Sequence, residues 1–322
     1  MHVVIIGGTG HVGTYLVPKL MEAGFQVTVV TRGKRRPYTP HGAWQDVRTV
    51  LIDRDEEEKS GSFGHKILDL KPDTVIDMIC FKEESARHLV EVLRGHIKYF
   101  LHCGTVWVHG KSVQVPISEE QPRQPIGVYG IQKAAIEAYL LDEARYNGFP
   151  VTCIHPGHIV GMGWVPLNPQ ANFNPEVYTR LARGEELFLP NQGTEIVHHV
   201  HADDVAQIFM KALFNWNAAI GESFHAVSPA ALTLRGYAES IARGFGKIAN
   251  LKFLPWEEWC QVVSPSDADA TRSHLDHNPN CYSIVKAQRL LNYQPRYSSL
   301  EAVFEALNWL IANSIIKTEN NS

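Results

Sequence analysis

The sequence predicts an α/β protein built on a doubly wound parallel sheet, with a smaller and mostly helical C-terminal lobe. Three observations predict it. A short apolar strand at the start of the chain runs directly into a cluster of glycines and then into a helical pattern. Strand-like and helical segments keep alternating over the first half of the chain, which indicates right-handed βαβ crossovers. The 322 residues, 44% of them hydrophobic, suffice for one large domain and a smaller lobe.

The first turn has the spacing of a dinucleotide-binding loop. The strand predicted over His2–Ile6 is apolar on both faces, and apolar residues recur at helical spacing over residues 12–23. Between them lies Gly-x-Gly-x-x-Gly, which begins at Gly8, and the looser Gly-x-x-Gly-x-x-Gly, which begins at Gly7. Such glycines let the backbone approach a pyrophosphate, toward which the helix directs unpaired N–H groups. We therefore predict a Rossmann sheet that holds a dinucleotide, with a purely structural turn as the alternative.

The residues after the second strand bear on the choice between NAD and NADP. A strand is predicted over Gln26–Val30, and an NAD enzyme typically places an acidic residue near its end to bind the ribose 2′-hydroxyl. Here residues 31–36 read Thr-Arg-Gly-Lys-Arg-Arg, without an acid. A guanidinium such as that of Arg32 matches a 2′-phosphate, because it is always charged and binds two oxygens at once. This favours NADP over NAD, with a solvated basic loop as the alternative.

The alternation continues to about residue 160. Strands are expected over residues 47–52, 74–79, 99–102 and 151–155, and helices over 83–94 and 134–146. Beyond it the alternation is less regular, and we expect a helix over 177–183, a strand over 196–201 and a helix over 204–215. From residue 233 the chain is expected to be mostly helical, apart from a polar loop over 264–280. We assign residues 1–165, together with about 192–228, to the Rossmann domain, and residues 166–191 and 229–322 to a substrate-binding lobe.

Composition and charge exclude several classes of protein. The formal net charge is −4 and the one dense basic run is residues 32–36, so nucleic-acid binding is disfavoured. No apolar run approaches the roughly 20 residues that span a bilayer, and the N-terminus lacks the basic segment of a signal peptide. Five scattered cysteines without a Cys-x-x-Cys motif suggest reduced thiols. We expect a cytoplasmic protein that neither enters a membrane nor holds a metal.

Tyr129 and Lys133 stand four positions apart, so on a helix they share one face. A phenol with a pKa of about 10 is a poor base at neutral pH. A neighbouring ammonium, together with the positive charge of an oxidised nicotinamide, would favour the phenolate. The alternative is a solvent-facing pair without a catalytic role.

Several segments, taken in chain order, resemble the extended short-chain dehydrogenase/reductases. The particular branch is the NAD-dependent epimerase/dehydratase family, which includes UDP-galactose 4-epimerase. The resemblance covers nearly the whole chain. The matching segments are the glycine turn at residues 7–13, Leu51-Ile52-Asp53, residues 78–81, 103–110, the pair Tyr129 and Lys133, and residues 155–161, 200–206 and 283–295.

The resemblance implies a catalytic set and a cofactor site. Thr105 would hydrogen-bond the reacting oxygen, Tyr129 would exchange a proton with it, and Lys133 would lower the pKa of Tyr129 and hold the nicotinamide ribose. Hydride would pass between the substrate carbon and the nicotinamide. Besides Tyr129 and Lys133, the implied cofactor contacts are Gly7, Thr9, Gly10, His11, Val12, Arg32, Asp53, Met78, His155, Pro156 and Gly157.

Departures from the family pattern concern the substrate. Sugar-nucleotide enzymes of this family usually clamp the diphosphate with two arginines, and here Val197 and the stretch 277–281 stand near those positions. This favours a smaller polyol, a free sugar, a sugar phosphate or another carbonyl compound. Dehydration is disfavoured, because Val-Trp follows Thr105 in place of Asp-Glu, so epimerase and reductase remain. The expected substrate contacts are Trp107, His109, His158, Arg272 and His277, with core packing as the alternative for Trp107 and His109.

Two non-catalytic functions remain as alternatives on the same fold. Relatives similar to the chloroplast stem-loop-binding proteins bind RNA, and their second strand also ends in a run like Thr-Arg-Gly-Lys. The acidic net charge and the intact set of Thr105, Tyr129 and Lys133 argue against this function. Cofactor-sensing members of the superfamily typically lose the Tyr or the Lys, and this chain keeps both.

Two further features have competing interpretations. His198, His199 and His201 suggest a metal site, but no carboxylate or cysteine stands at ligand spacing, so we expect none. Family members often form homodimers through helices like those expected over 83–94 and 134–146. Leu89, Val92 and Leu93 would supply apolar surface for such a dimer, or would instead cover the sheet.

Overall fold

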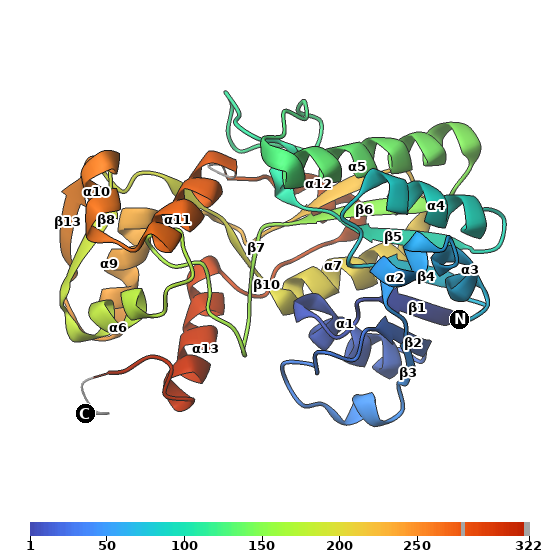
Figure 1. The fold of residues 1–322 in the computed structure, drawn as a ribbon, viewed down its shortest axis with the longest axis horizontal. Helices are drawn as coiled ribbons and strands as arrows, with labels where there is room; N and C mark the ends of the chain where they lie inside the picture. Colours follow the sequence, from blue (N-terminus) through green and yellow to red (C-terminus); the bar gives the residue numbers. More distant parts are fainter. Residues whose placement is uncertain (278–280, 319–322) are drawn as a thin grey trace.

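The computed structural model describes residues 1–277 and 281–318, and its centre is one parallel sheet (Figure 1). Seven strands lie in the order β11-β6-β5-β4-β1-β2-β3, and all neighbouring pairs are parallel. The order runs outward in both directions from β1 and β4, so the predicted doubly wound α/β fold is confirmed. The strands are β1 (His2–Ile6), β2 (Gln26–Thr31), β3 (Arg48–Leu51), β4 (Thr74–Asp77), β5 (Tyr99–Cys103), β6 (Val151–Pro156) and β11 (Ser223–Ala226).

Helices cover both faces of the sheet because its strands are apolar on both sides. Val3 and Val4 are neighbours in β1 but enter different cores, as the alternation of side chains along a strand requires. The core that contains Val3 also holds residues of α1, α7 and α12, and the core that contains Val4 holds residues of α3, α4 and α5. These helices are α1 (His11–Glu22), α3 (Phe63–Leu68), α4 (Glu83–Leu93), α5 (Gly127–Asn147), α7 (Ala202–Phe214) and α12 (Val285–Leu291).

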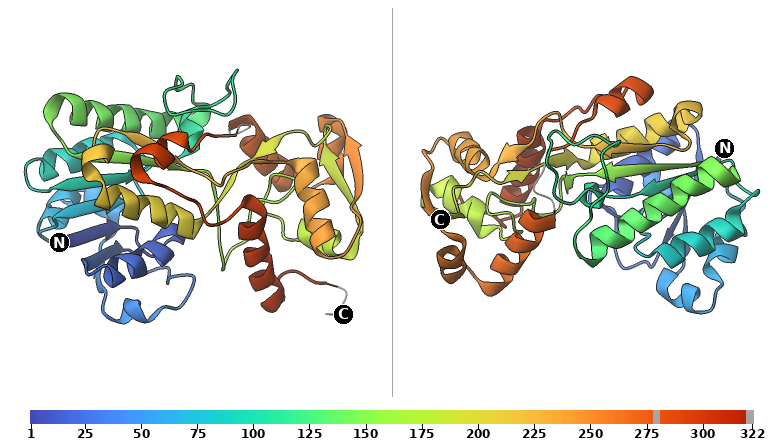
Figure 2. Two further views of the ribbon diagram at one scale, coloured as in Figure 1. Left: turned by 180° about the vertical axis from the view of Figure 1, so that it is seen from behind. Right: turned by 90° about the horizontal axis from the view of Figure 1, so that it is seen from above.

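A second lobe lies beside the sheet and has its own apolar core (Figure 2). Leu181, Tyr237 and Leu307 meet there from three different helices. The main elements of the lobe are α6 (Glu176–Arg183), β8 (Glu186–Pro190), α9 (Leu234–Gly244), β13 (Asn250–Leu254), α10 (Trp256–Val262), α11 (Pro265–His277) and α13 (Ser299–Ala312). Two short strand pairs join it to the sheet domain, β7 (His158–Val160) with β10 (His199–His201) and β9 (Ile196–Val197) with β12 (Leu232–Thr233).

The expectation of a polar loop over residues 264–280 is wrong for most of that range, because residues 265–277 form α11. Ser264 precedes the helix and its hydroxyl accepts a hydrogen bond from the Asp267 N–H (3.1 Å), while Pro265 takes the first helical position. Thr271 is fully buried and Ala268 nearly so. A helix with so little apolar surface shows hardly any hydrophobic periodicity. Its start signal, a capping serine before a proline, was nevertheless present in the sequence.

Other expected boundaries also change. The strand expected over 196–201 breaks at His198, because β9 pairs with β12 whereas β10 pairs with β7. The helix expected over 134–146 begins earlier, at Gly127, and so includes Tyr129 and Lys133. Short helical elements that the sequence did not indicate are α2 (Arg54–Lys59), α3, α8 (Trp216–Ala219) and the 3₁₀ turns η1 (Gly42–Gln45) and η2 (Val106–Val108). The strands β8, β11 and β13 were not expected either, and β13 lies in the segment from residue 233 that was expected to be mostly helical.

The apolar residues considered for dimerisation cover the chain's own sheet. Leu89 and Leu93 are fully buried in the core on the α4 face. Val92 packs against α3, where a Cβ on Gly64 would lie 2.9 Å from it. Leu89 and Leu93 therefore cover the sheet, which was the alternative interpretation, whereas Val92 is half-buried and the homodimer stays a prediction.

The division of the chain stays a proposal, in which residues 1–165 and 192–228 form one part and 166–191 and 229–322 the other. β11 falls in the segment 192–228 and forms one edge of the central sheet. Across the described residues, none of the helices combines the length and the apolar character that a membrane crossing needs. All five cysteines are free thiols.

We expect Gly13→Ala to destabilise the fold strongly. A Cβ at this position would lie 2.0 Å from the Gly8 carbonyl oxygen, a backbone atom that cannot move alone. The free energy of unfolding should fall by about 2–3 kcal/mol. Gly42→Ala is the matched control, because its Cβ would meet nothing within 4 Å, and its effect should stay within about 0.5 kcal/mol. Chemical denaturation of the two variants checks this, and equal midpoints would contradict it.

Candidate functional site

The predicted cofactor and catalytic residues follow the carboxyl ends of strands and so lie along one edge of the sheet (Figure 1). β1 leads to Gly7, β2 to Arg32, β3 to Asp53, β4 to Met78 and β5 to Thr105. In open parallel sheets ligands bind at this edge, beside the point where the strand order reverses. That point lies between β1 and β4, which are neighbours in the sheet.

The turn between β1 and α1 leaves its backbone open on one side. Gly7 has a φ of +83°, which favours glycine. Gly13 packs directly on Gly8, whereas a Cβ on Gly10 would meet nothing closer than 3.5 Å, so the chain leaves room at Gly10. α1 begins without a side-chain cap and without an acidic residue in its first turn, so its N–H groups are available to a ligand. These residues fit the pyrophosphate of a dinucleotide.

Three further predicted cofactor contacts lie at this turn. The Thr9 hydroxyl is hydrogen-bonded to a residue at the end of β2. The Val12 side chain is 5% exposed and packs in the core, so Val12 can offer a ligand only its backbone. His11 stacks on Trp164 with ring centroids 3.9 Å apart, and Tyr38 lies 4.7 Å from His11. Burial is the main cause that lowers the pKa of His11 to about 4, so this ring is neutral at pH 7. Sequence reasoning missed the two aromatic neighbours.

Arg32 and Asp53 lie at the ends of adjacent strands. Arg32 is exposed, and its Nη1 is 3.7 Å from a carboxylate oxygen of Asp55. Asp53 caps α2 by accepting a hydrogen bond from the Asp55 N–H (3.1 Å). Both positions face the edge where the adenosine end of a dinucleotide would extend from the glycine turn, and their cofactor contacts stay predictions.

Tyr129, Lys133 and Thr105 come together between α5 and the end of β5. The Thr105 hydroxyl is close enough to the phenol oxygen to favour its ionised form. Lys133 is 1% exposed, and its Nζ donates a hydrogen bond to the Cys103 carbonyl oxygen (2.8 Å). Nζ also lies 6.0 Å from the centre of the Tyr129 ring. The i,i+4 spacing on α5 therefore places both side chains on the helix face that meets β5.

The chain by itself keeps the phenol of Tyr129 protonated. The residue is 41% exposed overall, but desolvation of its hydroxyl, followed by the charge of Cys103, raises its pKa to about 12, against the opposing effect of Thr105. Burial also lowers the pKa of Lys133. Lys133 is not among the groups that shift the Tyr129 pKa in the chain alone, so its expected lowering of that pKa stays a prediction. The positive charge of an oxidised nicotinamide would favour the phenolate.

His155 is placed differently from the prediction. It is fully buried, its Nδ1 accepts a hydrogen bond from the Thr105 N–H (3.0 Å), and its Nε2 lies 2.9 Å from a carboxylate oxygen of Glu137. Both ring nitrogens are therefore occupied inside the chain, and the prediction of a cofactor contact through this side chain is wrong. Burial by itself would raise the pKa of Glu137, but His155 and Arg123 outweigh it and hold that pKa well below its usual range.

Pro156 and Gly157 follow β6 at the same edge of the sheet. Pro156 is buried, and a Cβ on Gly157 would lie 2.5 Å from the His198 carbonyl oxygen. Glycine is therefore required here for packing within the chain. Contact of these two residues with a cofactor stays a prediction.

A group of rings lies next to Tyr129 on the side of the second lobe. Trp107 packs edge-on against Tyr129, with ring centroids 5.5 Å apart, and lies 5.7 Å from His274 of α11. The rings of His158 and Phe173 are 5.3 and 5.2 Å from His274. Burial is the main cause that lowers the pKa of His158 well below its usual value, so its ring is neutral. Contact of Trp107 and His158 with a substrate stays a prediction.

Two other expected substrate contacts, His109 and Arg272, do not belong to this group of rings. His109 is 2% exposed, and its Nε2 lies 2.8 Å from Nε2 of His225 in the interior, so packing prevails for this residue. Arg272 stacks on Trp256 at 4.7 Å, on the opposite side of α11 from His274, and does not replace a missing clamp. His277 ends α11, and its side chain lies outside the described residues.

The three clustered histidines turn toward separate partners. Nε2 of His198 bonds the Ser228 carbonyl (2.9 Å), and Nε2 of His199 bonds the Leu167 carbonyl (3.0 Å). His201 bonds Glu305. Within the part of the chain that the structure describes, no group of three or more His, Cys, Asp or Glu side chains could hold a metal ion.

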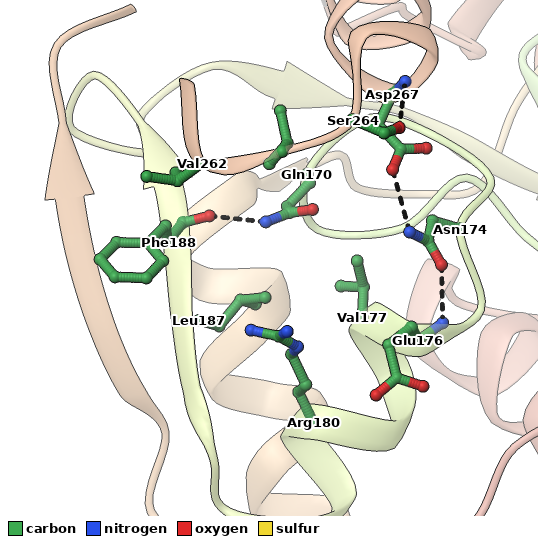
Figure 3. Close-up of a pocket in the computed structure, with 11 residues that line it drawn as sticks. Gln170, Asn174, Glu176, Val177, Arg180, Leu187, Phe188, Val262, Ser264 and Asp267 are labelled. Atoms are coloured by element: carbon green, nitrogen blue, oxygen red, sulfur yellow. Dashed lines mark hydrogen bonds between the residues drawn. The ribbon is translucent and has the colours of Figure 1, made fainter. Parts of the chain in front are cut away.

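A separate cavity of about 220 Å³ lies within the second lobe, between α6, β8 and the start of α11 (Figure 3). Gln170 bonds the Phe188 carbonyl (2.7 Å) on one side, and Asn174 bonds Asp267 (2.9 Å) on the other. Thr105, Tyr129 and Lys133 do not line this cavity. We assign no chemistry to this cavity.

Because the chain keeps the phenol neutral, we expect Tyr129 to ionise near pH 12 in the protein without dinucleotide. Alkaline titration of the ultraviolet absorbance isolates this phenol when the curve of Tyr129→Phe is subtracted from that of the wild type. Addition of the oxidised dinucleotide should shift the ionisation to lower pH, because its ring is positively charged. An ionisation at or below the ordinary phenol pKa of about 10 in the free protein would contradict the assigned surroundings.

Comparison with known proteins identifies the family. The model of the NAD dependent epimerase/dehydratase family matches residues 3–225. A 2'-dehydrokanamycin reductase from Streptomyces kanamyceticus is 25% identical over 312 residues, which cover 97% of this chain and 85% of that protein. The chloroplast stem-loop binding protein of 41 kDa b from Arabidopsis thaliana is 25% identical over 318 residues, covering 95% and 78%.

The fold is also that of a solved epimerase. The crystal structure of UDP-glucose 4-epimerase with UDP-glucose from Thermotoga maritima superposes with a TM-score of 0.74 at 20% identity, over 98% of this chain and 100% of that one. The family model spans the glycine turn, the Thr105 turn and the Tyr129–Lys133 helix in one continuous match. The chain therefore belongs to the NAD dependent epimerase/dehydratase family.

Proposed function

We propose that this chain is an NAD(P)-dependent epimerase or oxidoreductase that acts on a hydroxyl or carbonyl carbon of a sugar or related small molecule. The observation that carries the proposal is the meeting of the Tyr129 phenol with the Thr105 hydroxyl and the buried Lys133 ammonium, at the sheet edge that also holds the glycine turn. Family membership and a relative named as a reductase support the same reaction class.

Each of the three residues has a role that its surroundings support. Tyr129 exchanges a proton with the reacting oxygen. Thr105 holds the same oxygen through its hydroxyl. Lys133 fixes α5 against β5 and stands behind the phenol. A bound nicotinamide would supply the hydride acceptor or donor and, when oxidised, the positive charge that favours the phenolate.

The surroundings of the phenol favour a substrate without a diphosphate. The rings of Trp107, His274 and Phe173 offer apolar faces beside the phenol. Such faces suit the C–H faces of a sugar or polyol. Arg272 stacks on Trp256, so this residue supplies no counterpart to the usual arginine clamp.

For the cofactor, the family description names NAD, and we propose that NADP also binds and is preferred. Support comes from Arg32, which follows the end of β2 in a run, residues 31–36, that contains no acidic residue. Its contact with Asp55 is long and exposed, so the guanidinium can turn toward a phosphate at little cost.

RNA binding is the alternative function, because one relative is named as a stem-loop binding protein. Binding of RNA would need neither the buried Lys133 nor the phenol beside Thr105. RNA affinity that falls steeply with salt and is unchanged in Tyr129→Phe, in a protein without turnover, would favour this alternative.

We expect Tyr129→Phe to lower kcat by about 100-fold or more, because it removes the proton that the reacting oxygen exchanges. The dissociation constant for the dinucleotide should change by less than about threefold, since the ring remains. Steady-state kinetics with a panel of carbonyl compounds and a separate binding titration measure the two effects. Tyr146→Phe is the matched control, because this tyrosine of the same helix is 79% exposed and should leave kcat unchanged. An unchanged kcat in Tyr129→Phe would contradict the proposed function.

We expect Arg32→Ala to weaken NADP binding by about tenfold and NAD binding by less than about twofold, because only NADP carries the 2′-phosphate. Arg48→Ala is the matched control, since Arg48 begins β3 and so lies at the opposite edge of the sheet. Fluorescence or calorimetric titration of both dinucleotides measures the ratio. Equal weakening of NAD and NADP in Arg32→Ala would mean that this residue does not read the phosphate.

A further inference from the structure

His155 links the reacting edge of the sheet to the interior. Its ring is fully buried, with Nδ1 3.0 Å from the Thr105 backbone nitrogen and Nε2 2.9 Å from Oε1 of Glu137. A backbone N–H can only donate, so Nδ1 accepts and carries no proton. Nε2 must then carry the ring proton and donate it to the Glu137 carboxylate. The two partners thus select one neutral tautomer.

The segment that carries Thr105 is held at three successive residues. Lys133 donates to the Cys103 carbonyl (2.8 Å), the Gly104 N–H donates to β6 (2.7 Å), and the Thr105 N–H donates to His155. A Cβ on Gly104 would lie 2.3 Å from Nδ1 of His155, so the ring packs directly on the backbone. The position of this imidazole therefore determines where the Thr105 hydroxyl projects.

Arg123 extends the network outward from Glu137. Its Nε donates to Oε2 of Glu137 (2.8 Å) and its Nη2 to Oε1 (2.6 Å). Glu137 is 2% exposed, so this two-pronged contact and the bond from His155 compensate the buried charge. Arg123 and Glu137 line a surface groove of about 550 Å³ between α5 and α12, and Arg145 lines the same groove.

We propose that His155 is a positioning residue, held by Glu137 and Arg123, which keeps Thr105 where its hydroxyl meets the reacting oxygen. The proposal rests on the proposed function of Thr105. His155 itself touches neither substrate nor dinucleotide, because both of its nitrogens are used within the chain. A backbone shift of about 1 Å at Thr105 is enough to lower turnover by up to about 100-fold while leaving dinucleotide binding intact.

Two substitutions of His155 test the roles of its two ring nitrogens separately. The amide oxygen of Asn stands at the position of Nδ1, so His155→Asn can still accept from Thr105. The amide of Gln stands at the position of Nε2, so His155→Gln keeps the link to Glu137 and leaves the Thr105 N–H without an acceptor. We expect His155→Asn to keep kcat within about fivefold of wild type and His155→Gln to lose about 10- to 100-fold. The dinucleotide dissociation constant should change less than about twofold in both.

A second readout does not depend on activity. Amide hydrogen exchange at Thr105 should stay slow in His155→Asn and become faster in His155→Gln, because only the Asn variant retains an acceptor. Equal exchange rates and equal kcat in the two variants would overturn the proposal. Dinucleotide binding that weakens in step with kcat would also overturn it, since the side chain would then contact the cofactor.

A substitution of Arg123, at the outer end of the network, tests the proposal if the variants of the buried His155 fail to fold. Arg123→Lys keeps the charge but loses the two-pronged contact, and should lower kcat about threefold or more without changing dinucleotide binding. Arg145→Ala, in the same groove, should leave kcat unchanged. Unchanged kcat and Thr105 exchange in Arg123→Lys would overturn the network. Failure of the proposed function has a different signature, in which the wild type has no turnover and Tyr129→Phe changes nothing.

Discussion

The buried ammonium of Lys133 is the constraint on which the reacting edge depends. A charged group that is 1% exposed is costly unless it is paired, and here Nζ donates to the Cys103 carbonyl and faces the Phe81 ring at 4.9 Å. α5 cannot slide along β5 without leaving this charge unpaired. Tyr129 precedes Lys133 by one helical turn and Thr105 follows Cys103 by two residues, so this contact brings the phenol and the hydroxyl together.

Two glycines position the two halves of the site, because without a side chain each allows a close contact. Gly13 lets α1 pack on Gly8, which directs the helix N-terminus at the space beside Gly10. Gly104 lets the His155 ring pack on the backbone just before Thr105. In both places a Cβ would lie within 2.3 Å of another atom, so the close approach itself sets the geometry. The dinucleotide turn and the catalytic turn are thus built by the same physical means.

The second lobe contributes side chains to the surroundings of the phenol. α11 brings His274 toward Trp107, and His158 and Phe173 complete a group of rings next to the phenol. Residues two positions apart on a helix point in nearly opposite directions, which is why Arg272 turns to Trp256 while His274 turns to Trp107. The Arg272 guanidinium therefore stacks on Trp256 and does not join the rings next to the phenol.

The sequence by itself determined the parts that depend on near neighbours in the chain. The strand followed by glycines, the doubly wound alternation and the i,i+4 pair of Tyr129 and Lys133 are local patterns, and the structure contains them all. Only the tertiary structure decided that His155 serves Thr105, fifty positions away, that His109 is buried against His225, and that residues 265–277 form a helix. Backbone propensity and spacing act between close neighbours, whereas the partner of a buried imidazole depends on which distant strand or helix packs beside it.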